Sequence, residues 1–334
     1  MVKRLLNCSP KEMLALNSRE LVDAIRMSEG RTIIGAARVR GPNLIQYVSS
    51  PETVAAFGAD IVAINAYDLH DPIFPGFPSK NPKDDEPYRN IQVQIGKGWT
   101  AREIREMIGR PIMAGLYVPP SLYGIKPIDT GFADQFRPAE AREQRMAATE
   151  KNINLLMEQG FDMLGLGGHG ASHADRVETV ELIRKIAGDN IVIMCGVPHG
   201  PGLLYAKDVP YNLREIFTPD MAADLVKAGG DIITCPAVGS LPGFTPSHVG
   251  AVIDAVHKAG GLADVGIHNS QEGTDVETIK RIAIDNKTLG ADTFTLGDAA
   301  YNENMGDPEV YMALSIAVKG KRHTYRRMSE SVLR

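Results

Sequence analysis

The chain has 334 residues, 43% of them hydrophobic and 23% charged, a composition that supports a large buried core and excludes a disordered chain. Its formal net charge of −5 argues against a nucleic-acid-binding protein, which normally carries a basic face. No apolar run approaches the roughly 20 residues that span a bilayer, and three scattered cysteines are too few for a disulfide framework.

The first 30 residues precede the first predicted strand. Met1–Glu12 lacks the apolar stretch and the small-residue cleavage site of a signal peptide, so we expect a cytoplasmic protein with no membrane partner. Pro10–Met27 is predicted to form an extra helix that closes the bottom of the fold. We treat residues 1–30 as a helical extension of a single domain that spans residues 1–334.

One local pattern recurs four times along the chain. A helix-like segment ends in Gly, an Asp follows two residues later, and a short apolar run comes next. The Gly suits the left-handed residue that stops a helix, and short, continuously apolar runs are typical of parallel strands buried on both faces. The lead-ins and their predicted strands are Gly58–Asp60 before Ile61–Asn65, Gly160–Asp162 before Met163–Gly167, Gly229–Asp231 before Ile232–Cys235, and Gly290–Asp292 before Thr293–Leu296.

Four further apolar runs lie between these, which makes eight predicted strands. The further runs are Thr32–Val39, Ile112–Val118, Ile191–Cys195 and Leu262–Ile267. Segments with apolar residues at three- and four-residue spacing separate the strands and predict helices. These segments are Ala139–Gln159, Ala174–Ala187, Pro219–Ala228, Pro246–Ala259, Val276–Leu289 and Pro308–Val318. Strand alternating with helix eight times predicts an α/β fold, a (β/α)8 TIM barrel, with an open doubly wound sheet as the alternative.

The connections after the second and third predicted strands are longer than the others. They begin with Ala66–Thr100, rich in Pro, Asp and Lys, and with Pro119–Pro138, rich in Pro, Gly and Tyr. Both follow C-terminal strand ends, which form the functional face of such a barrel. Loops of this length are usually lids, binding loops or interface loops, and an insertion without a role at the site is the alternative. We expect both over the barrel mouth or at a subunit contact near it.

Histidines gather after the predicted C-terminal strand ends. Five of the eight lie there: His70, His169, His173, His199 and His268. Histidine is the usual general base and the commonest metal ligand at neutral pH. We assign the catalytic roles to His199 or His268 as acid or base, with Asp298 as the orienting carboxylate. For each histidine alone, a satisfied structural role is the alternative.

A divalent metal is a second way to use the same residues. His169, His199, His268 and Asp298 follow strands 4, 5, 7 and 8, whose ends ring one cavity in a barrel. Three histidines and one carboxylate suit zinc or another transition metal. The tight spacings His-x-His and His-Glu-x-x-His do not occur. A metal-free pair of His268 and Asp298 therefore remains open.

The run Gly165–Gly170 fits the pattern Gly-x-Gly-x-x-Gly after a strand and before a helix. A dinucleotide site would also need an acidic residue at the end of the next strand, and Met194–Gly196 has none. We therefore expect no nucleotide cofactor. The amides of this run and the following helix N-terminus are suited to a phosphate or carboxylate, and a tight turn is the alternative. The predicted substrate-binding residues are Arg38, Asn65, Gly167, Gly168, Gly170 and Asn269.

The C-terminal segment, residues 319–334, is basic, with the run Lys319–Met328. A solvated tail is the first interpretation, and pairing with an acidic surface of a neighbouring subunit is the second. Together with Leu296–Asn302, this segment resembles members of an uncharacterised bacterial barrel family. Its members are loosely labelled haloacid-dehalogenase-like or phosphoenolpyruvate-phosphonomutase-like and can occur beside sugar phosphotransferase genes. The first label would need an Asp-x-Asp nucleophile after the first strand, and Thr32–Arg40 contains no Asp.

These observations predict an enzyme of central or carbohydrate metabolism that acts on a small, phosphorylated or carboxylated substrate. We expect a lyase, of the aldolase type, or an isomerase, working at the C-terminal rim. A metal-dependent hydrolase on the same rim is the first alternative. A non-catalytic barrel that binds a sugar phosphate and regulates a partner is the second. We also expect a homo-oligomer and no nucleic-acid partner.

Overall fold

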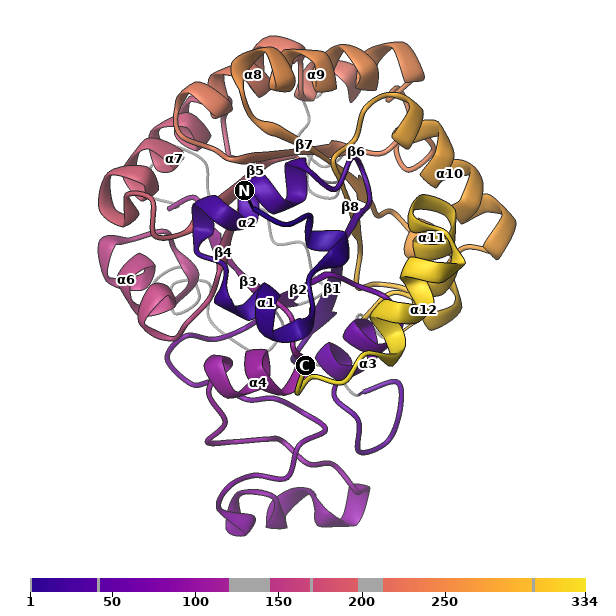
Figure 1. The fold of residues 1–334 in the computed structure, drawn as a ribbon. Helices are drawn as coiled ribbons and strands as arrows, with labels where there is room; N and C mark the ends of the chain where they lie inside the picture. The colour runs from indigo at the N-terminus through magenta and orange to yellow at the C-terminus, as the bar shows by residue number, and fades with distance from the viewer. Residues whose placement is uncertain (1, 41–42, 120–144, 169–170, 198–212, 302–303) are drawn as a thin grey trace.

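The computed structural model describes residues 2–40, 43–119, 145–168, 171–197, 213–301 and 304–334. Eight parallel strands close into a barrel in chain order, and β8 pairs with β1 (Figure 1). The strands are β1 (Thr32–Arg38), β2 (Ile61–Asn65), β3 (Ile112–Tyr117), β4 (Met163–Gly167), β5 (Val192–Gly196), β6 (Ile232–Pro236), β7 (Leu262–Ile267) and β8 (Thr293–Leu296). The predicted (β/α)8 barrel is confirmed, and the open sheet is wrong.

Helices surround the barrel and bury their apolar faces against its outer wall. They are α3 (Ser50–Ala56), α4 (Ala101–Ile108), α6 (Glu150–Glu158), α7 (His173–Ala187), α8 (Pro219–Lys227), α9 (Pro246–Ala259), α10 (Val276–Thr288) and α11 (Pro308–Lys319). The helix predicted over Ala139–Gln159 differs, since α6 begins only at Glu150. Ala147 forms a β-bridge with Tyr117, and the Thr149 side chain then caps the helix by accepting the Asn152 N–H.

The N-terminal segment crosses the bottom of the barrel as two helices, α1 (Pro10–Ala15) and α2 (Ser18–Arg26), after a short 3-10 helix η1 (Leu5–Asn7). The single helix predicted over Pro10–Met27 is interrupted because Asn17 forms a capping box with Glu20 and starts a new helix. Apolar side chains of α1 and α2 pack with inward-facing residues of the strands in one buried cluster. In Figure 1 this segment lies in front of the barrel.

The four Gly-x-Asp lead-ins share one structural role. The backbone N–H of each Asp donates to a carbonyl at the start of the preceding strand, at 2.8–3.0 Å. Its carboxylate accepts the N–H of that same residue, at 2.8–2.9 Å. The pairs are Asp60 with Ile33, Asp162 with Ile112, Asp231 with Ile193, and Asp292 with Ala263. Each glycine has a positive φ, as its helix-stopping role requires. The motif therefore joins neighbouring strands at the N-terminal end of the barrel.

The basic C-terminal segment is not a solvated tail. It forms helix α12 (Lys321–Ser329), and the side chains of Lys319 and Arg327 are buried against Asp60. The burial of these cations could not be predicted from the local sequence, because their acidic partner, Asp60, lies some 260 residues earlier in the chain. Pairing of the segment with a neighbouring subunit stays a prediction.

The long connection after β2 contains two short 3-10 helices, η2 (Pro82–Asp84) and η3 (Glu86–Ile91). Figure 1 shows this part beyond α4, outside the ring of helices, so it does not cover the strand ends as predicted. A subunit contact there stays a prediction. Most of the second long connection, residues 120–144, lies outside the described residues. In the part of the chain that the structure describes, no helix is both long and apolar enough to cross a membrane.

Candidate functional site

Strand alternation places polar side chains on the inner wall at the C-terminal half of the barrel. Ile34 and Ile61 face inward, since they belong to the cluster that α1 and α2 close from below. Side chains four residues further along a strand face the same way. Arg38 and Asn65 therefore also face inward, and they are paired neighbours in the sheet.

Three elements meet in a contact between Arg38, Asn65 and Asp298. One carboxylate oxygen of Asp298 accepts a hydrogen bond from Asn65 Nδ2 at 2.9 Å and lies 3.3 Å from Arg38 Nε. The Asp298 side chain is only 11% exposed and that of Arg38 is 27% exposed. A charge-assisted contact with so little access to water holds its geometry better than a surface ion pair. The rim thus presents a fixed guanidinium and a fixed amide.

A histidine and a carboxyl group lie together on the neighbouring wall. The position that a Cβ atom at Gly297 would occupy is 2.6 Å from His268 Nδ1 and 3.2 Å from Glu272 Oε1. Only glycine allows this approach, because any side chain at residue 297 would collide with the imidazole. His268 follows β7, Glu272 lies in the 3-10 helix η6 (Gln271–Gly273), and Gly297 follows β8. Gly297 therefore leaves the space beside His268 and Glu272 that a side chain would fill.

Glu272 is a buried carboxyl group, only 2% exposed. Burial raises its pKa, and the negative charge of Asp298 raises it further. Its Oε2 atom is buried and has no hydrogen-bond partner among the described residues. A carboxyl group of raised pKa beside a histidine is suited to holding and passing a proton.

The backbone next to these groups is held in the left-handed region. Ala66, directly after Asn65, has φ 56°, and Asn269 and Ser270, directly after His268, have φ 61° and 77°. Such conformations cost free energy for residues other than glycine and cluster at functional sites. Their position beside the predicted site residues supports a functional role for this rim.

A second group of charges lies beside β1 and β2. Asp68 is 4% exposed and forms ion pairs with Arg40 and Arg145, both at 3.0 Å. The Asp68 carboxylate also accepts the backbone N–H of His70. Two guanidinium groups fixed on one buried carboxylate increase the positive charge near Arg38. They favour an anionic ligand at this side of the rim.

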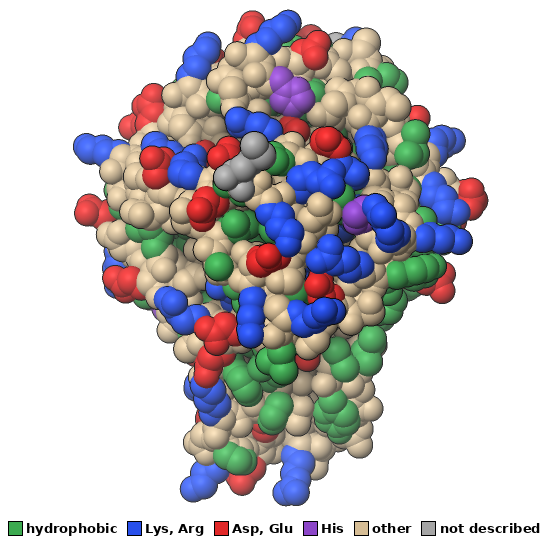
Figure 2. Space-filling model, in the orientation of Figure 1, with side chains coloured by type: hydrophobic (Ala, Val, Ile, Leu, Met, Phe, Trp, Pro, Cys, Tyr) green, Lys and Arg blue, Asp and Glu red, His purple; other side chains and the backbone are tan. Residues whose placement is uncertain are grey.

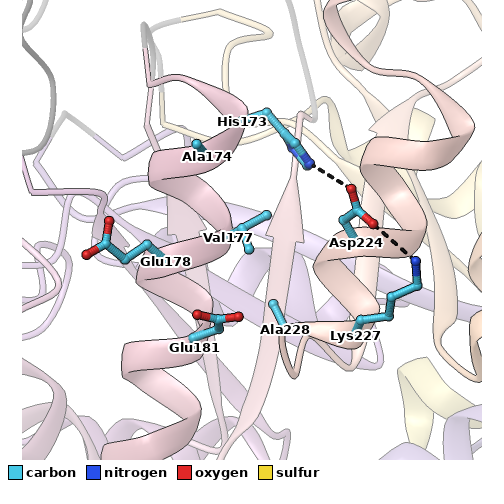
Figure 3. Close-up of a pocket in the computed structure, with 8 residues that line it drawn as sticks. All are labelled: His173, Ala174, Val177, Glu178, Glu181, Asp224, Lys227 and Ala228. Carbon is cyan, nitrogen blue, oxygen red and sulfur yellow. Dashed lines mark hydrogen bonds and ion pairs between the residues drawn. The ribbon is translucent and has the colours of Figure 1, made fainter.

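Two of the five loop histidines contact side chains of the surrounding helices. His70 contacts the Asn152 side chain of α6 at 3.0 Å, and His173 lies 3.5 Å from Asp224 of α8. Figure 3 shows His173 and Asp224 facing each other across an outer groove between α7 and α8. Each of these two histidines thus has a polar partner outside the contact of Arg38, Asn65 and Asp298.

A buried acid lies lower in the barrel, between the site and the bottom cluster. Asp264 of β7 is fully buried, and its carboxylate oxygens accept hydrogen bonds from Thr234 at 2.7 Å, Thr293 at 2.7 Å and Thr295 at 2.9 Å. Burial raises its pKa to about 6, because the three hydroxyl donors only partly offset the loss of hydration.

This pKa predicts a pH-dependent stability. The folded state holds the Asp264 proton up to about pH 6, whereas the unfolded chain releases it near pH 4. The free energy of unfolding should therefore fall by about 3 kcal/mol as pH rises from about 4 to about 6, and stay lower above that. Asp264→Asn should remove this loss and be more stable than wild type at pH 8, in urea unfolding at pH 4.5, 6 and 8. Asp285→Asn, an exposed control, should follow wild type. Parallel curves for Asp264→Asn and wild type would contradict the prediction.

The sequence-predicted residues fall into three groups. Arg38, Asn65 and Asp298 come together, and His268 lies beside Glu272. Gly167 ends β4, while Gly168 uses its carbonyl to accept from Ala171 N–H and from Arg176. His169, Gly170 and His199 lie outside the described residues, so the convergence of the four proposed metal ligands stays a prediction. Among the residues with described positions, no three His, Cys, Asp or Glu side chains gather to hold a metal ion.

The sequence analysis missed Glu272. It stands four residues after His268, and that spacing within a strand-end loop was a usable signal. Its burial, and its closeness to Asp298, depend on how the loops after β7 and β8 pack together. Asp298 accepts from Arg38 and Asn65, whereas Glu272 lies on the side of His268.

A family model described as "Domain of unknown function (DUF7916)" matches residues 6–334. No curated protein matches the chain. The chain is similar to the thiamine phosphate pyrophosphorylase of Pyrococcus furiosus, with 8% identity, 88% of this chain and 98% of that chain covered, and a TM-score of 0.43.

Two further solved structures are the YdjI aldolase of Escherichia coli K12 and the deoxyribose phosphate aldolase of Aeropyrum pernix. The first is 13% identical over 92% of this chain and 94% of that one, with a TM-score of 0.42. The second is 12% identical over 88% of this chain and 91% of that one, with a TM-score of 0.44. At these identities and scores the similarity says nothing of this chain's substrate, and neither loose family label is tested.

Proposed function

The chain belongs to the family described as "Domain of unknown function (DUF7916)", which names no activity, and we propose a function from its rim residues. The protein is an enzyme that transfers a proton at a carbon next to a carbonyl group in a small anionic metabolite. The reaction is that of an isomerase or of an aldolase-type lyase.

One observation carries this proposal: a histidine beside a buried carboxyl group of raised pKa, close to a fixed arginine and amide. His268 Nδ1 and Glu272 Oε1 both lie within 3.2 Å of the position of a Cβ at Gly297. The charge of Asp298, which receives Arg38 and Asn65, acts on the pKa of Glu272. A proton-transfer site and an anion-binding site therefore adjoin.

In the proposed reaction, His268 removes a proton from the carbon next to the substrate carbonyl. The electron pair of the broken C–H bond moves onto the carbonyl oxygen and forms an enolate. Donors fixed at the rim stabilise that negative charge. In an α-hydroxy carbonyl compound the hydroxyl proton of the attacked carbon then passes to the enolate oxygen, and return of the abstracted proton to the former carbonyl carbon completes an isomerisation. In the lyase direction the histidine takes a hydroxyl proton, the adjacent C–C bond breaks, and the resulting enolate is protonated.

The other residues hold the groups that react. Arg38 and Asn65 bind the substrate's carboxylate or phosphate, with Asp298 fixing their orientation. Glu272 orients His268 and supplies a proton when the enolate collapses. Gly167, Gly168 and Asn269, with Gly170 and His199 from beyond the described residues, remain further proposed contacts to the substrate. Proton transfer of this kind contributes about 10²–10⁴ in rate.

Solvent deuterium exchange tests the proposal without a known product. We expect at least one compound among hydroxy acids, keto acids and sugar phosphates to take up deuterium from D₂O at the carbon next to its carbonyl group. Arg38→Gln should lower kcat/KM for exchange about 10–100-fold, because it removes one charged hydrogen bond to the anion. Mass spectrometry or proton NMR of the recovered compound gives the rate.

Arg281→Gln, on the exposed face of α10, is the matched control and should exchange at the wild-type rate. Arg38→Lys should retain part of the activity because the charge remains while the planar fork is lost. Tight binding of a sugar phosphate without exchange would contradict the proposed enzymatic function and favour a non-catalytic barrel that regulates a partner. Full exchange activity in Arg38→Gln would show that Arg38 does not bind the substrate.

A further inference from the structure

A hollow of about 460 Å³ lies at the opposite end of the barrel from the rim, between the N-terminal segment and helix α12. Its lining comes from the N-terminal segment around η1 and from helix α12. The residues are Lys3, Arg4, Asn7, Arg322, His323 and Arg326. Figure 2 shows lysine and arginine side chains gathered on this face. The proposed catalytic chemistry uses none of these residues.

The lining contains four permanent cations and no carboxylate. Lys3 pairs with Glu12, and Arg326 pairs with Glu330, both outside the lining. Within the described residues, Arg4 and Arg322 form no ion pair with a carboxylate. This concentration of positive charge stands on a chain of formal net charge −5. An electropositive hollow on an acidic protein is a specific local feature and does not follow from composition.

Helix α12 carries positively charged side chains in its first turn, where positive charge is least favourable. The first turn of a helix favours acidic side chains, because the unpaired N–H groups there give it positive potential. The first turn of α12 holds no acidic residue and instead carries Lys321, Arg322 and His323. Burial lowers the pKa of His323, and the charges of Arg322, Arg31, Arg4 and Arg326 lower it further. An anion in the hollow would relieve this repulsion.

The lining is held in place before any ligand arrives. Arg326 donates to the Asn7 carbonyl at 3.1 Å, and Arg327 donates to the carbonyls of Cys8 at 3.1 Å and Leu5 at 2.8 Å. These bonds fasten α12 to the N-terminal segment. With the Asn7 amide turned so that its oxygen faces Arg4, that oxygen accepts from Arg4 Nη2 at 2.9 Å. The backbone of both walls and the side chain of Arg326 are therefore fixed without a ligand, which lowers the cost of ordering on binding.

We propose that this hollow binds a small ligand with at least two phosphate groups, such as a diphosphate or a bisphosphate. The site is separate from the rim and goes beyond the proposed function. Its volume lies within the range of about 300–1,000 Å³ that is usual for small-molecule pockets. The chain's net charge of −5 opposes the binding of a long polyanion.

Calorimetric titration with inorganic pyrophosphate at about 0.1 M salt tests the site. We expect binding to wild type, and a Kd about 100-fold weaker in the double variant Arg4→Gln/Arg322→Gln, near tenfold for each guanidinium group that is removed. Arg281→Gln should bind like wild type. Arg38→Gln should also keep this binding, whatever it does to exchange at the rim. An unchanged melting temperature without ligand confirms that the double variant is folded.

Equal pyrophosphate affinity in the double variant and in wild type would overturn the proposal. Loss of binding in Arg38→Gln alone would also overturn it, because the calorimetric signal would then come from pyrophosphate bound at the rim. The single charge reversal Arg322→Glu is a second variant, and retention of wild-type affinity there would also overturn the site. Tighter binding to phosphatidylglycerol vesicles than to pyrophosphate, lost in the same double variant, would replace the small ligand by a lipid surface.

Discussion

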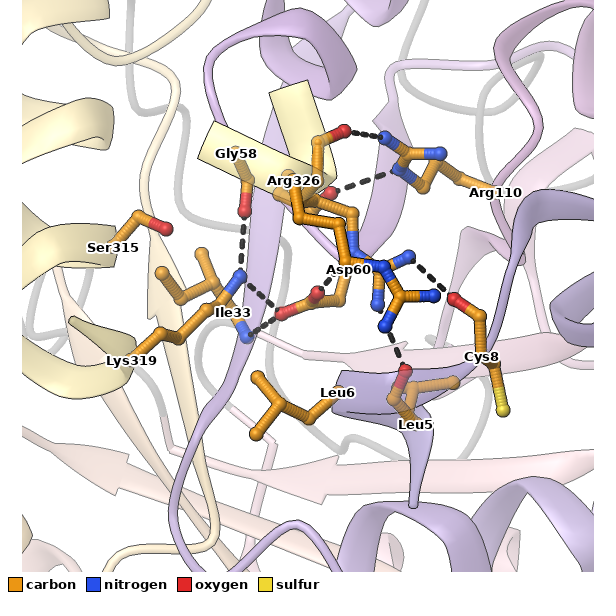
Figure 4. A network of polar contacts seen from close by, with 12 residues as sticks. Leu5, Leu6, Cys8, Ile33, Gly58, Asp60, Arg110, Ser315, Lys319 and Arg326 are labelled. Carbon is orange, nitrogen blue, oxygen red and sulfur yellow. Dashed lines mark hydrogen bonds and ion pairs between the residues drawn. The ribbon is translucent and has the colours of Figure 1, made fainter. Parts of the chain in front are cut away.

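Asp60→Asn should lower the free energy of unfolding by about 3–5 kcal/mol, because it leaves two buried cations without the carboxylate that they share. Asp60 lies 2.6 Å from Lys319 Nζ and 2.9 Å from Arg327 Nε (Figure 4). Their side chains are at most 4% exposed. Burial alone would raise the pKa of Asp60, but the two cations outweigh it and lower that pKa.

The same carboxylate also joins separate parts of the fold. It accepts the Ile33 N–H of β1, while Arg327 reaches the N-terminal segment and Arg110 donates to the Arg327 carbonyl at 2.8 Å. Loss of the Asp60 charge therefore weakens the docking of α12 and of the chain start together. Urea unfolding at pH 7 measures the change.

Lys319→Met is the matched control for Asp60→Asn. It removes one cation but leaves Asp60 paired with Arg327, so it should cost clearly less than Asp60→Asn. In the double variant, Lys319→Met should restore part of the stability lost in Asp60→Asn, because one unpaired charge disappears. A loss below about 1 kcal/mol in Asp60→Asn would show that water or other groups solvate the two cations, contrary to this account.

His268→Ala should lower the rate of deuterium exchange about 10²–10⁴-fold, the range expected for loss of a general base. His268 follows a strand end and packs against Gly297 rather than in the apolar core. We therefore expect its removal to change the melting temperature little. Exchange kinetics and thermal unfolding of the same preparation separate the two effects. A lower melting temperature with normal exchange per folded molecule would make His268 structural.

Two neighbouring variants sharpen this test. Gly297→Ala should also lower exchange strongly, since a Cβ atom there would lie 2.6 Å from His268 Nδ1 and displace the imidazole. Glu272→Gln keeps the shape but cannot titrate, so the limb of the pH–rate profile that Glu272 produces should disappear. A profile unchanged by Glu272→Gln would leave Glu272 with a packing role only.

The sequence by itself determined the barrel. Seven of the eight predicted strand starts coincide with the structure, and the eighth differs by one residue, Ile191 against Val192. The reason is local: short, continuously apolar runs are typical of parallel strands buried on both faces, and before four of them a glycine of positive φ stops the preceding helix. The identity of strand-end residues such as Arg38, Asn65 and Asp298 follows from those boundaries.

The sequence could not assign the roles of charged groups whose partners lie far along the chain. From the sequence, Asp60 is indistinguishable from an ordinary turn residue, because its partners Lys319 and Arg327 are distant along the chain. A basic segment likewise has the same sequence pattern whether it is exposed to solvent or buried against a carboxylate. Glu272 acquires its raised pKa only when the loops after β7 and β8 exclude water around it. Burial and electrostatic pairing depend on distance in space, which barrel closure fixes, whereas strand and helix patterns depend on distance along the chain.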